Sequence, residues 1–205
     1  MYFQTLDDKK QCVGIYKEGK IYFDSMPEDL RRTWAFTGSI KDKEVQFAQI
    51  YANGKSLEEA CPEEFKKELA DSNKKFLACI KSFETSKIDP RDHCIFDMIP
   101  YRFLMQFCEI RDKVTRHVFE NHEKPRNYEL LSESYKLLHK IKYQQLNVNS
   151  AGCRDLQISS KSRKKVADLI QRRYVSYNLF GAATGRLTTN PKSFPILTVR
   201  KDFRR

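Results

Sequence analysis

Residues 101–118 read YRFLMQFCEIRDKVTRHV, and this stretch carries the clearest periodic pattern in the chain. Its apolar positions follow one another at intervals of four, three, four and four residues: Phe103, Phe107, Ile110, Val114 and Val118. Side chains three or four positions apart share one face of a helix. We therefore expect a long helix with a single apolar stripe, ending near residues 121–122, and a fold that buries this stripe.

Two further helices are expected downstream. The first has apolar positions 131, 135, 138 and 141 on one face, and a short linker joins it to the helix at 101–121. Helices connected in this way commonly pack as an antiparallel pair. The second, shorter helix covers residues 160–174, with Ser160 or Ser162 as its cap. After Tyr177 no period is sustained, and glycines and prolines indicate turns.

The N-terminal part of the chain combines strand and helix signals. Two β-rich runs, residues 12–16 and 21–23, surround Gly19, which indicates a hairpin that needs positive φ at this glycine. Another strand is expected at residues 33–36. Ser56 and Glu59 have the spacing of a capping box ahead of a helix that continues to Ile80. The expected fold class is α+β, predominantly α, beginning with a small α+β module.

Composition favours a water-soluble globular protein. The chain has 205 residues, of which 40% are hydrophobic and 32% charged. It has no apolar stretch near the ~20 residues that span a bilayer, and its first residues lack the features of a secretion signal. We expect a cytoplasmic protein, in the host cytoplasm if it is viral, with no membrane partner. The six cysteines include no closely spaced pair typical of zinc sites, so we expect reduced, mostly buried thiols.

The charge is concentrated at one end of the chain. Residues 1–100 carry 16 basic and 18 acidic side chains, whereas residues 151–205 carry 13 and 3. Such a block repels itself unless a polyanion neutralises it, and nucleic acid is the commonest such partner. A solvated basic tail is the alternative. Nucleic-acid binding is favoured because apolar and aromatic residues alternate with these cations, which is unusual in disordered tails.

Four of these cations stand at the expected start of the helix at 160–174: Lys161, Arg163, Lys164 and Lys165. The positive end of a helix dipole disfavours cations, and an anion would relieve the repulsion. Free amides, hydroxyls and lysines together suit a phosphate group. A merely solvated first turn is the alternative, since surface charges there cost only tenths of a kcal/mol.

Motifs of catalysis and metal binding are missing. The four histidines are scattered, and no grouping of Ser, His and Asp indicates a hydrolase. Residues 181–188 differ from a phosphate-binding loop of nucleotide hydrolases in three respects: a three-residue spacer, arginine instead of lysine, and Leu187 at the hydroxyl position. We expect no catalytic and no metal-binding residue in this chain.

Residues 177–191 read YNLFGAATGRLTTNP and resemble the stretch of family A DNA polymerases that enters the palm just before its first catalytic strand. That family has a tyrosine, a run of small residues, Thr-Gly-Arg-Leu, two hydroxyl residues and a nearby proline. Residues 196–205 resemble the apolar and then basic stretch that follows. The family usually has one more residue before the proline, and then Asn and Gln side chains that touch the template; here residues 192–195 are Lys-Ser-Phe-Pro.

The resemblance implies how this segment would contact DNA. Arg186, on a turn formed with Gly185, would reach the minor-groove acceptors that every base pair presents at a primer end. Thr184, Thr188 and Thr189 would lie beside backbone phosphates, Arg200 would contact a phosphate, and Lys192 could do the same. The resemblance also implies a division into residues 1–98 (an α+β module without assigned role), residues 99–176 (thumb-like helices, including the expected pair) and residues 177–205 (the turn-rich start of the palm).

The implied function is that of the N-terminal part of a family A DNA-directed DNA polymerase of viral type, which grips primer–template DNA during replication. Catalysis in that family needs Mg²⁺ held by palm aspartates and a helix that receives the deoxynucleotide. Asp202 is the only acidic residue after Asp168. We therefore expect this chain alone to be inactive, with Mg²⁺ and nucleotides bound only in the complete enzyme. The alternative is a noncatalytic, basic nucleic-acid-binding module.

Overall fold

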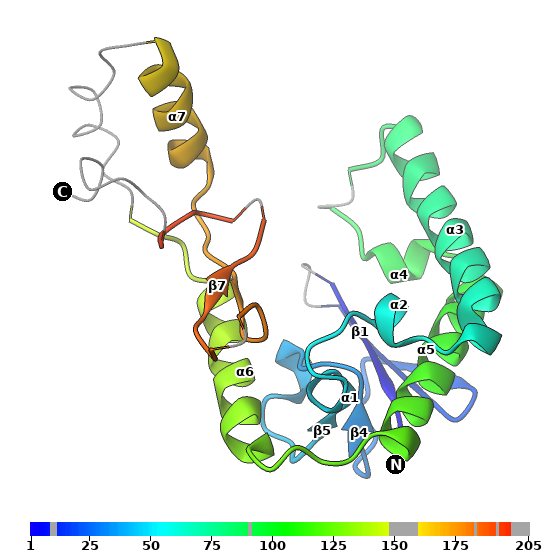
Figure 1. Ribbon diagram of the computed structural model, residues 1–205. Coiled ribbons are helices and arrows are strands. Elements are labelled where there is room, and N and C mark those ends of the chain that lie inside the picture. The colour runs from blue at the N-terminus through cyan, green and yellow to red at the C-terminus, as the bar shows by residue number, and fades with distance from the viewer. Residues whose placement is uncertain (9–11, 90–91, 148–159, 183, 192, 198–205) are drawn as a thin grey trace. The chain divides into compact units, whose positions relative to one another are not determined.

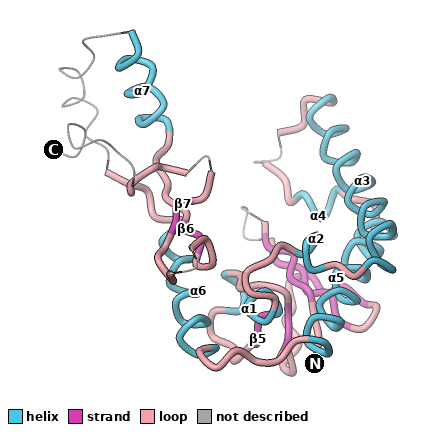
Figure 2. Tube along the Cα trace, viewed as in Figure 1, coloured by secondary structure: helices cyan, strands magenta, loops and turns pink. Residues whose placement is uncertain are grey.

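The computed structural model describes residues 1–205 except 9–11, 90–91, 148–159, 183, 192 and 198–205 (Figure 1). Helices hold about 47% of the described residues and strands 14%, so the fold is mixed α+β and predominantly α, as predicted. Figure 2 shows the helices, in cyan, dominating the described chain. The strands are β1 (Gln4–Asp7), β2 (Val13–Lys17), β3 (Lys20–Phe23), β4 (Arg32–Thr33), β5 (Gln46–Phe47), β6 (Tyr177–Asn178) and β7 (Thr188–Thr189).

The helices in the described residues are the 3₁₀ turn η1 (Gly38–Ile40) and α1 (Ala48–Tyr51), α2 (Leu57–Ala60), α3 (Glu63–Thr85), α4 (Ile95–Met98), α5 (Tyr101–Asn121), α6 (Tyr128–Lys142) and α7 (Ser160–Gln171). The chain forms two compact units, which we call the N-terminal unit (residues 1–128) and the C-terminal unit (residues 129–205). The sequence-based division after residue 98 would separate α5 from the sheet and helices that it contacts.

Three antiparallel strands, in the order β1-β2-β3, form the sheet of the N-terminal unit. The predicted hairpin is confirmed: β2 and β3 are joined at Glu18 and Gly19, which have φ of 48° and 78°. Positive φ at both central residues is typical of the tight hairpin turn whose twist matches the strands, and glycine adopts it without strain. The sequence analysis did not identify β1, which pairs with β2 from Gln4↔Tyr16 to Asp7↔Val13.

The apolar stripe of α5 packs within the N-terminal unit, where Ile110, Val114 and Val118 are buried and Phe103 and Phe107 are half-buried. Near the start of α5, Leu104 and Cys108 pack against Leu6 and Tyr16 of the sheet and against the partly buried Phe76 of α3. The middle of the helix packs on α2 and α3, and Val118 near its end packs on α1. Figure 1 shows α3 and α5 side by side. The helix therefore exists as predicted, and the elements that bury its stripe precede it in the chain.

The predicted helix that begins after Ser56 is interrupted by Pro62. The capping box is present: Ser56 Oγ accepts from the Glu59 amide at 3.2 Å, and the Glu59 carboxylate accepts from the Ser56 amide at 2.7 Å. However, α2 ends at Ala60, and Cys61 is extended with φ −68° and ψ 124°. Because a residue before proline avoids helical angles, the chain breaks here and α3 starts anew after Pro62.

The predicted strand at residues 33–36 is wrong beyond its first residue. Thr33 belongs to β4, which pairs in parallel with β5, but the chain bends at Trp34. The Trp34 carbonyl accepts from the Gln49 amide at 3.0 Å, and its ring packs among the residues around Val118 and Leu57. Packing of this one aromatic ring therefore overrides the local β propensity.

A disulfide joins Cys12 and Cys94, so the prediction of reduced thiols is wrong for this pair. The two residues are 82 positions apart, and only the packing of α4 beside the start of β2 brings them together. The prediction holds for Cys61 and Cys108, which are free and buried, whereas free Cys79 is half-buried. Cys153 lies outside the described residues.

In the C-terminal unit, α6 covers the predicted second helix. The third helix is shorter than the predicted 160–174, because α7 ends at Gln171. Tyr174 instead forms a bridge with Gln145, and its carbonyl accepts from the Phe194 amide at 2.8 Å. Beyond it, β6 and β7 form a small antiparallel pair, with Tyr177 opposite Thr189 and Asn178 opposite Thr188.

Candidate nucleic-acid interface

The β6–β7 hairpin carries the segment whose sequence resembles the polymerase palm entry. Asn178 forms a turn at the end of β6, because its side-chain oxygen accepts from the Phe180 amide at 2.9 Å. This is a local turn that Asn favours, since its side chain can replace a backbone acceptor two residues away. The chain then runs through residues 179–187 and returns along β7.

Polar side chains close the base of this hairpin. The Asn190 amide group Nδ2 donates to Ser176 Oγ at 2.7 Å, and the Asn190 backbone N–H donates to the Ser176 carbonyl at 2.8 Å. Ser193 Oγ donates to the Asn190 carbonyl at 2.9 Å. All three residues are half-buried, so these bonds are partly shielded from water and hold the two ends of the hairpin at a fixed spacing.

Gly181 is required by the close approach of the two sides of the hairpin. A Cβ at this position would collide with Thr188 Oγ1 and would also meet Thr188 Cβ at 3.0 Å. The Thr188 side chain therefore fills the place that any other residue at 181 would occupy. Glycine at position 181 thus has a packing reason in addition to any contact with a ligand.

Thr184, Gly185 and Arg186 form the tip of the hairpin, and all three are exposed. Gly185 has φ +70°, a conformation that favours glycine, and its amide donates to the Ala182 carbonyl at 3.1 Å. Among the residues that the structure describes, the Arg186 side chain has no hydrogen bond and no ion pair. The turn therefore presents an uncompensated guanidinium to solvent.

The helix α7 is tied to the same unit at its C-terminal end. Arg172 forms an ion pair with Asp168 at 2.9 Å, and its Nη1 donates to the Ser193 carbonyl at 3.4 Å. Val166 anchors the helix because its side chain is fully buried. Arg163 and Lys164 are exposed on the first turns of α7. The helix start and the hairpin tip are thus two basic groups of one compact unit.

This segment has little opposing charge. Asp168 is the only acidic residue between positions 160 and 197, and Arg172 engages its carboxylate. No carboxylate of this segment is left to neutralise Lys164 or Arg186. A surface of this kind attracts polyanions and binds them in a salt-dependent manner.

The predicted site residues fall into three groups. The structure brings Thr184, Gly185 and Arg186 together at the tip, and it places Thr188 and Thr189, both half-buried, in β7. It places Arg163 and Lys164 on α7. Four predicted contacts cannot be located in this way: Lys192 and Arg200 lie outside the described residues, as do the side chains of Lys161 and Lys165.

Sequence reasoning missed the residues that hold this site in place. Ser176 and Asn190 are 14 positions apart, and Arg172 is 21 positions from Ser193. These partners are too far apart in the chain for any helical or strand period to relate them. The only local signal was the occurrence of glycines and prolines, which predicted turns but not the residues that pair across them.

No family model matches this chain, and no match was found among curated proteins or solved structures. Within the described residues, no helix is long and apolar enough to cross a membrane.

Proposed function

We propose that this chain grips primer–template DNA as the N-terminal part of a family A DNA polymerase. The observation that carries the proposal is the exposed Thr184-Gly185-Arg186 tip, where a left-handed glycine presents an arginine that has no side-chain partner among the described residues. This tip lies in the segment whose residue order resembles the palm entry of that family.

The chemistry of the tip suits a contact with the minor groove of a duplex. A guanidinium donates several hydrogen bonds in a plane, and the groove presents acceptors on every base pair. Such a contact recognises correct pairing geometry rather than sequence. The Thr184 hydroxyl is exposed beside Arg186 and is available to a backbone phosphate, whereas Thr188 Oγ1 faces Gly181.

The start of α7 would supply the second contact, with the DNA backbone. Lys164 and Arg163 are exposed there, and the first-turn amides of a helix point toward an incoming anion. Contacts of this kind provide affinity and register without reading bases. In the complete enzyme, Mg²⁺ bound by palm aspartates would stabilise the charge that develops during phosphoryl transfer. The residues of this chain would position the duplex.

Binding of the full chain to a fluorescent primer–template duplex tests the proposal. If five to eight phosphates are contacted, the log–log plot of affinity against salt should have a slope of about −5 to −7 between roughly 50 and 200 mM salt. Lys164→Ala should make the slope less steep by about one. Lys74→Ala, an exposed lysine of α3, is the matched control and should change neither affinity nor slope.

Two results would count against the proposal: a slope near zero, or a strong preference for one duplex sequence. A noncatalytic, basic nucleic-acid-binding module remains the second candidate, favoured by the fact that α7 presents cations on an amphipathic helix. That candidate predicts that Arg186→Ala and Lys164→Ala have the same effect on binding. The polymerase proposal predicts that they differ.

A further inference from the structure

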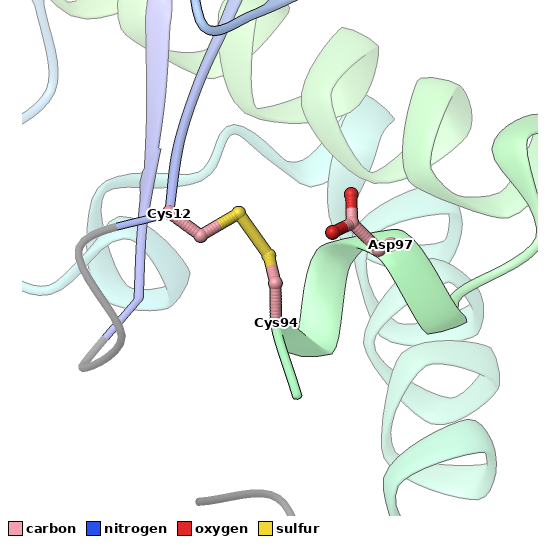
Figure 3. Close-up of side chains that lie close together, drawn as sticks. All are labelled: Cys12, Cys94 and Asp97. Carbon is pink, nitrogen blue, oxygen red and sulfur yellow. A yellow bond between two sulfur atoms is a disulfide. The ribbon is translucent and has the colours of Figure 1, made fainter. Parts of the chain in front are cut away.

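Cys12, Cys94 and Asp97 form a cluster of metal-ligand groups in the N-terminal unit (Figure 3). The two sulfurs and a carboxylate oxygen of Asp97 all lie within 4.8 Å of one another. Cys12 lies just before β2, and Cys94 is the residue immediately before α4. Asp97 follows Cys94 by three positions, so the first turn of α4 brings its carboxylate to the disulfide.

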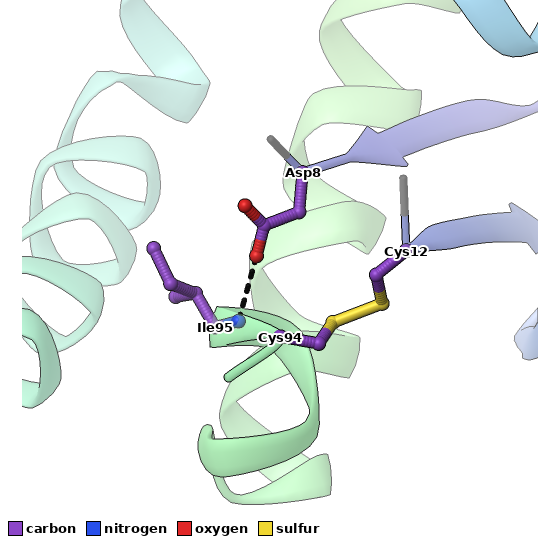
Figure 4. Close-up of a disulfide and its surroundings, with 4 residues drawn as sticks. All are labelled: Asp8, Cys12, Cys94 and Ile95. Carbon is purple, nitrogen blue, oxygen red and sulfur yellow. Dashed lines mark hydrogen bonds between the residues drawn. A yellow bond between two sulfur atoms is a disulfide. The ribbon is translucent and has the colours of Figure 1, made fainter. Parts of the chain in front are cut away.

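The backbone positions of both cysteines are held by bonds other than the disulfide. The Asp8 carboxylate accepts from the Ile95 amide at 2.7 Å, which fixes the residue after Cys94 (Figure 4). The Asp8 amide donates to the Cys12 carbonyl at 3.0 Å. Asp8 therefore joins the two cysteine-bearing segments directly, by bonds that do not involve the disulfide.

The Asp97 side chain is exposed, and it has no hydrogen bond or ion pair within the described part of the chain. The first turn of α4 favours a carboxylate through the helix dipole, but the neighbouring disulfide carries no charge and offers Asp97 no counter-ion. Next to two thiolates it would complete a set of three anionic ligands that only a cation can hold together. Both cysteines are half-buried, so small molecules and ions can reach them.

We propose that, when the disulfide is reduced, Cys12, Cys94 and Asp97 bind one Zn²⁺ ion, with water as the fourth ligand. A dithiol reductant opens the disulfide: the reductant becomes a disulfide, and its two protons pass to the two cysteine sulfurs. Zn²⁺ then displaces both protons and forms two Zn–S bonds. In the oxidised protein, the disulfide links the segments that carry Cys12 and Cys94. In the reduced protein, the metal ion links them.

The geometry and the ligand types favour zinc. A tetrahedral Zn²⁺ with Zn–S bonds of about 2.3 Å needs its two sulfurs roughly 3.8 Å apart, a spacing that cysteines with a Cα–Cα distance of 5.9 Å reach by side-chain rotation. Thiolates select soft or borderline cations, whereas Mg²⁺ and Ca²⁺ prefer oxygen ligands alone. The chain spacing explains why no zinc motif is visible in the sequence, since Cys12 and Cys94 are 82 positions apart.

The other described cysteines do not compete for the metal. Cys108 is fully buried, and burial raises the pKa of its thiol to about 12, so it stays protonated at neutral pH. Cys61 is also buried, and desolvation raises the pKa of its thiol. Cys79 packs beside the core residues around Leu104 and belongs to no group of three metal-ligand side chains within the described part of the chain.

The test is a Zn²⁺ titration of the full chain against a chromogenic chelator, before and after reduction with a phosphine. All proteins carry Cys153→Ser, because Cys153 lies outside the described residues. The reduced chain should bind one Zn²⁺ and release about two protons, since both thiols must ionise. The oxidised chain should bind none at this site.

Two substitutions and two matched controls localise the ion. Asp97→Asn should weaken binding at least about tenfold, because even residues that only support a ligand change metal affinity by about 10–100-fold. It leaves both cysteines intact, so equal melting temperatures of its oxidised form and the parent show that it folds. Cys94→Ser should abolish stoichiometric binding. The exposed Asp71→Asn and the half-buried Cys79→Ser should bind like the parent.

The proposal is overturned if the reduced parent binds Zn²⁺ no more tightly than Cys94→Ser does, or if Asp97→Asn binds as tightly as the parent. Stoichiometric binding by the oxidised chain would place the ion elsewhere and would also overturn it. None of these results depends on DNA binding, so they test the zinc site independently of the proposed polymerase function.

Discussion

The Gln4 side chain of β1 donates a hydrogen bond from Nε2 to Thr115 Oγ1 of α5 at 3.1 Å, across 111 residues of chain. Both side chains are buried, with exposed fractions of 4% and 0%. Thr115 Oγ1 in turn donates to the Arg111 carbonyl at 2.7 Å. A single hydroxyl therefore satisfies a buried amide of the sheet and a carbonyl of its own helix.

Thr115→Val should lower the free energy of unfolding by about 1–3 kcal/mol, because it leaves the Gln4 amide buried without an acceptor. Adding Gln4→Leu should restore part of the loss, since both polar partners are then gone. Thr85→Val is the matched control: Thr85 makes the same bond to the carbonyl four residues earlier but is exposed. Urea denaturation measures all four proteins. Equal losses for Thr115→Val and Thr85→Val would show that the bond to Gln4 contributes nothing.

Gly181→Ala should loosen the β6–β7 hairpin, because the new methyl group overlaps the Thr188 side chain. Overpacking of this kind costs about 1–3 kcal/mol, so hydrogen exchange of the Asn190 amide should accelerate about tenfold or more. Thr188→Ala, added to Gly181→Ala, removes the overlapping atoms and should restore slow exchange. If the double variant exchanges as fast as Gly181→Ala alone, the collision with Thr188 is not the cause.

Arg186→Ala separates the two candidate functions. In a complete polymerase that contains this chain, losing hydrogen bonds from a charged group at the primer end should lower catalytic efficiency by about ten- to a hundredfold. Discrimination against mismatched primer ends should fall with it. Lys164→Ala should weaken DNA binding and leave discrimination unchanged. Steady-state incorporation on matched and mismatched primers gives both quantities. Identical behaviour of the two variants would make Arg186 another phosphate contact.

Cys108 predicts a pH dependence of stability. Burial raises the pKa of its thiol from the ordinary 9.0 to about 12. Above pH 9 the unfolded chain loses this proton while the folded chain keeps it, so the stability that Cys108 contributes is lost as pH rises from 9 toward 12. The difference in unfolding free energy between the parent and Cys108→Ala should therefore shrink over this range.

Leu104→Ala is the control for this effect, because Leu104 lies in the same core cluster and does not titrate. Its difference from the parent should stay constant with pH. Guanidinium denaturation at several pH values provides both comparisons. A constant difference for Cys108→Ala would contradict the buried, neutral thiol.

Much of the fold could be predicted because its signals are local. The period of α5, the positive φ at Gly19 and the capping box at Ser56 each depend on residues within a few positions of one another. The strand β1 could not be predicted in this way: its burial alternates along the strand, but one buried position is the polar Gln4, which bonds to Thr115 of α5, so the residue types show no apolar alternation. The disulfide was missed because Cys12 and Cys94 are 82 positions apart.

In the candidate interface, too, only the features with local sequence signals could be predicted. Gly185 was expected at a turn from the sequence, and the turn is present with φ +70°. The arrangement that supports it was hidden, because Ser176, Asn190 and Ser193 are related by the return of the chain and not by spacing. Similarly, the end of α7 at Gln171 depends on the pairing of Tyr174 with Gln145, which no helical pattern contains.

On the ribosome, α5 is made after the sheet and the helix that it packs against. The strands β1 to β3 and the helix α3 all leave the ribosome first, while the residues of α5 that will cover Leu6, Tyr16 and Phe76 are still to be synthesised. At about 5–20 residues per second, the 21 residues of α5 take ~1–4 s to make. Until they emerge, the nascent chain exposes the apolar side chains that this one helix covers in the folded protein.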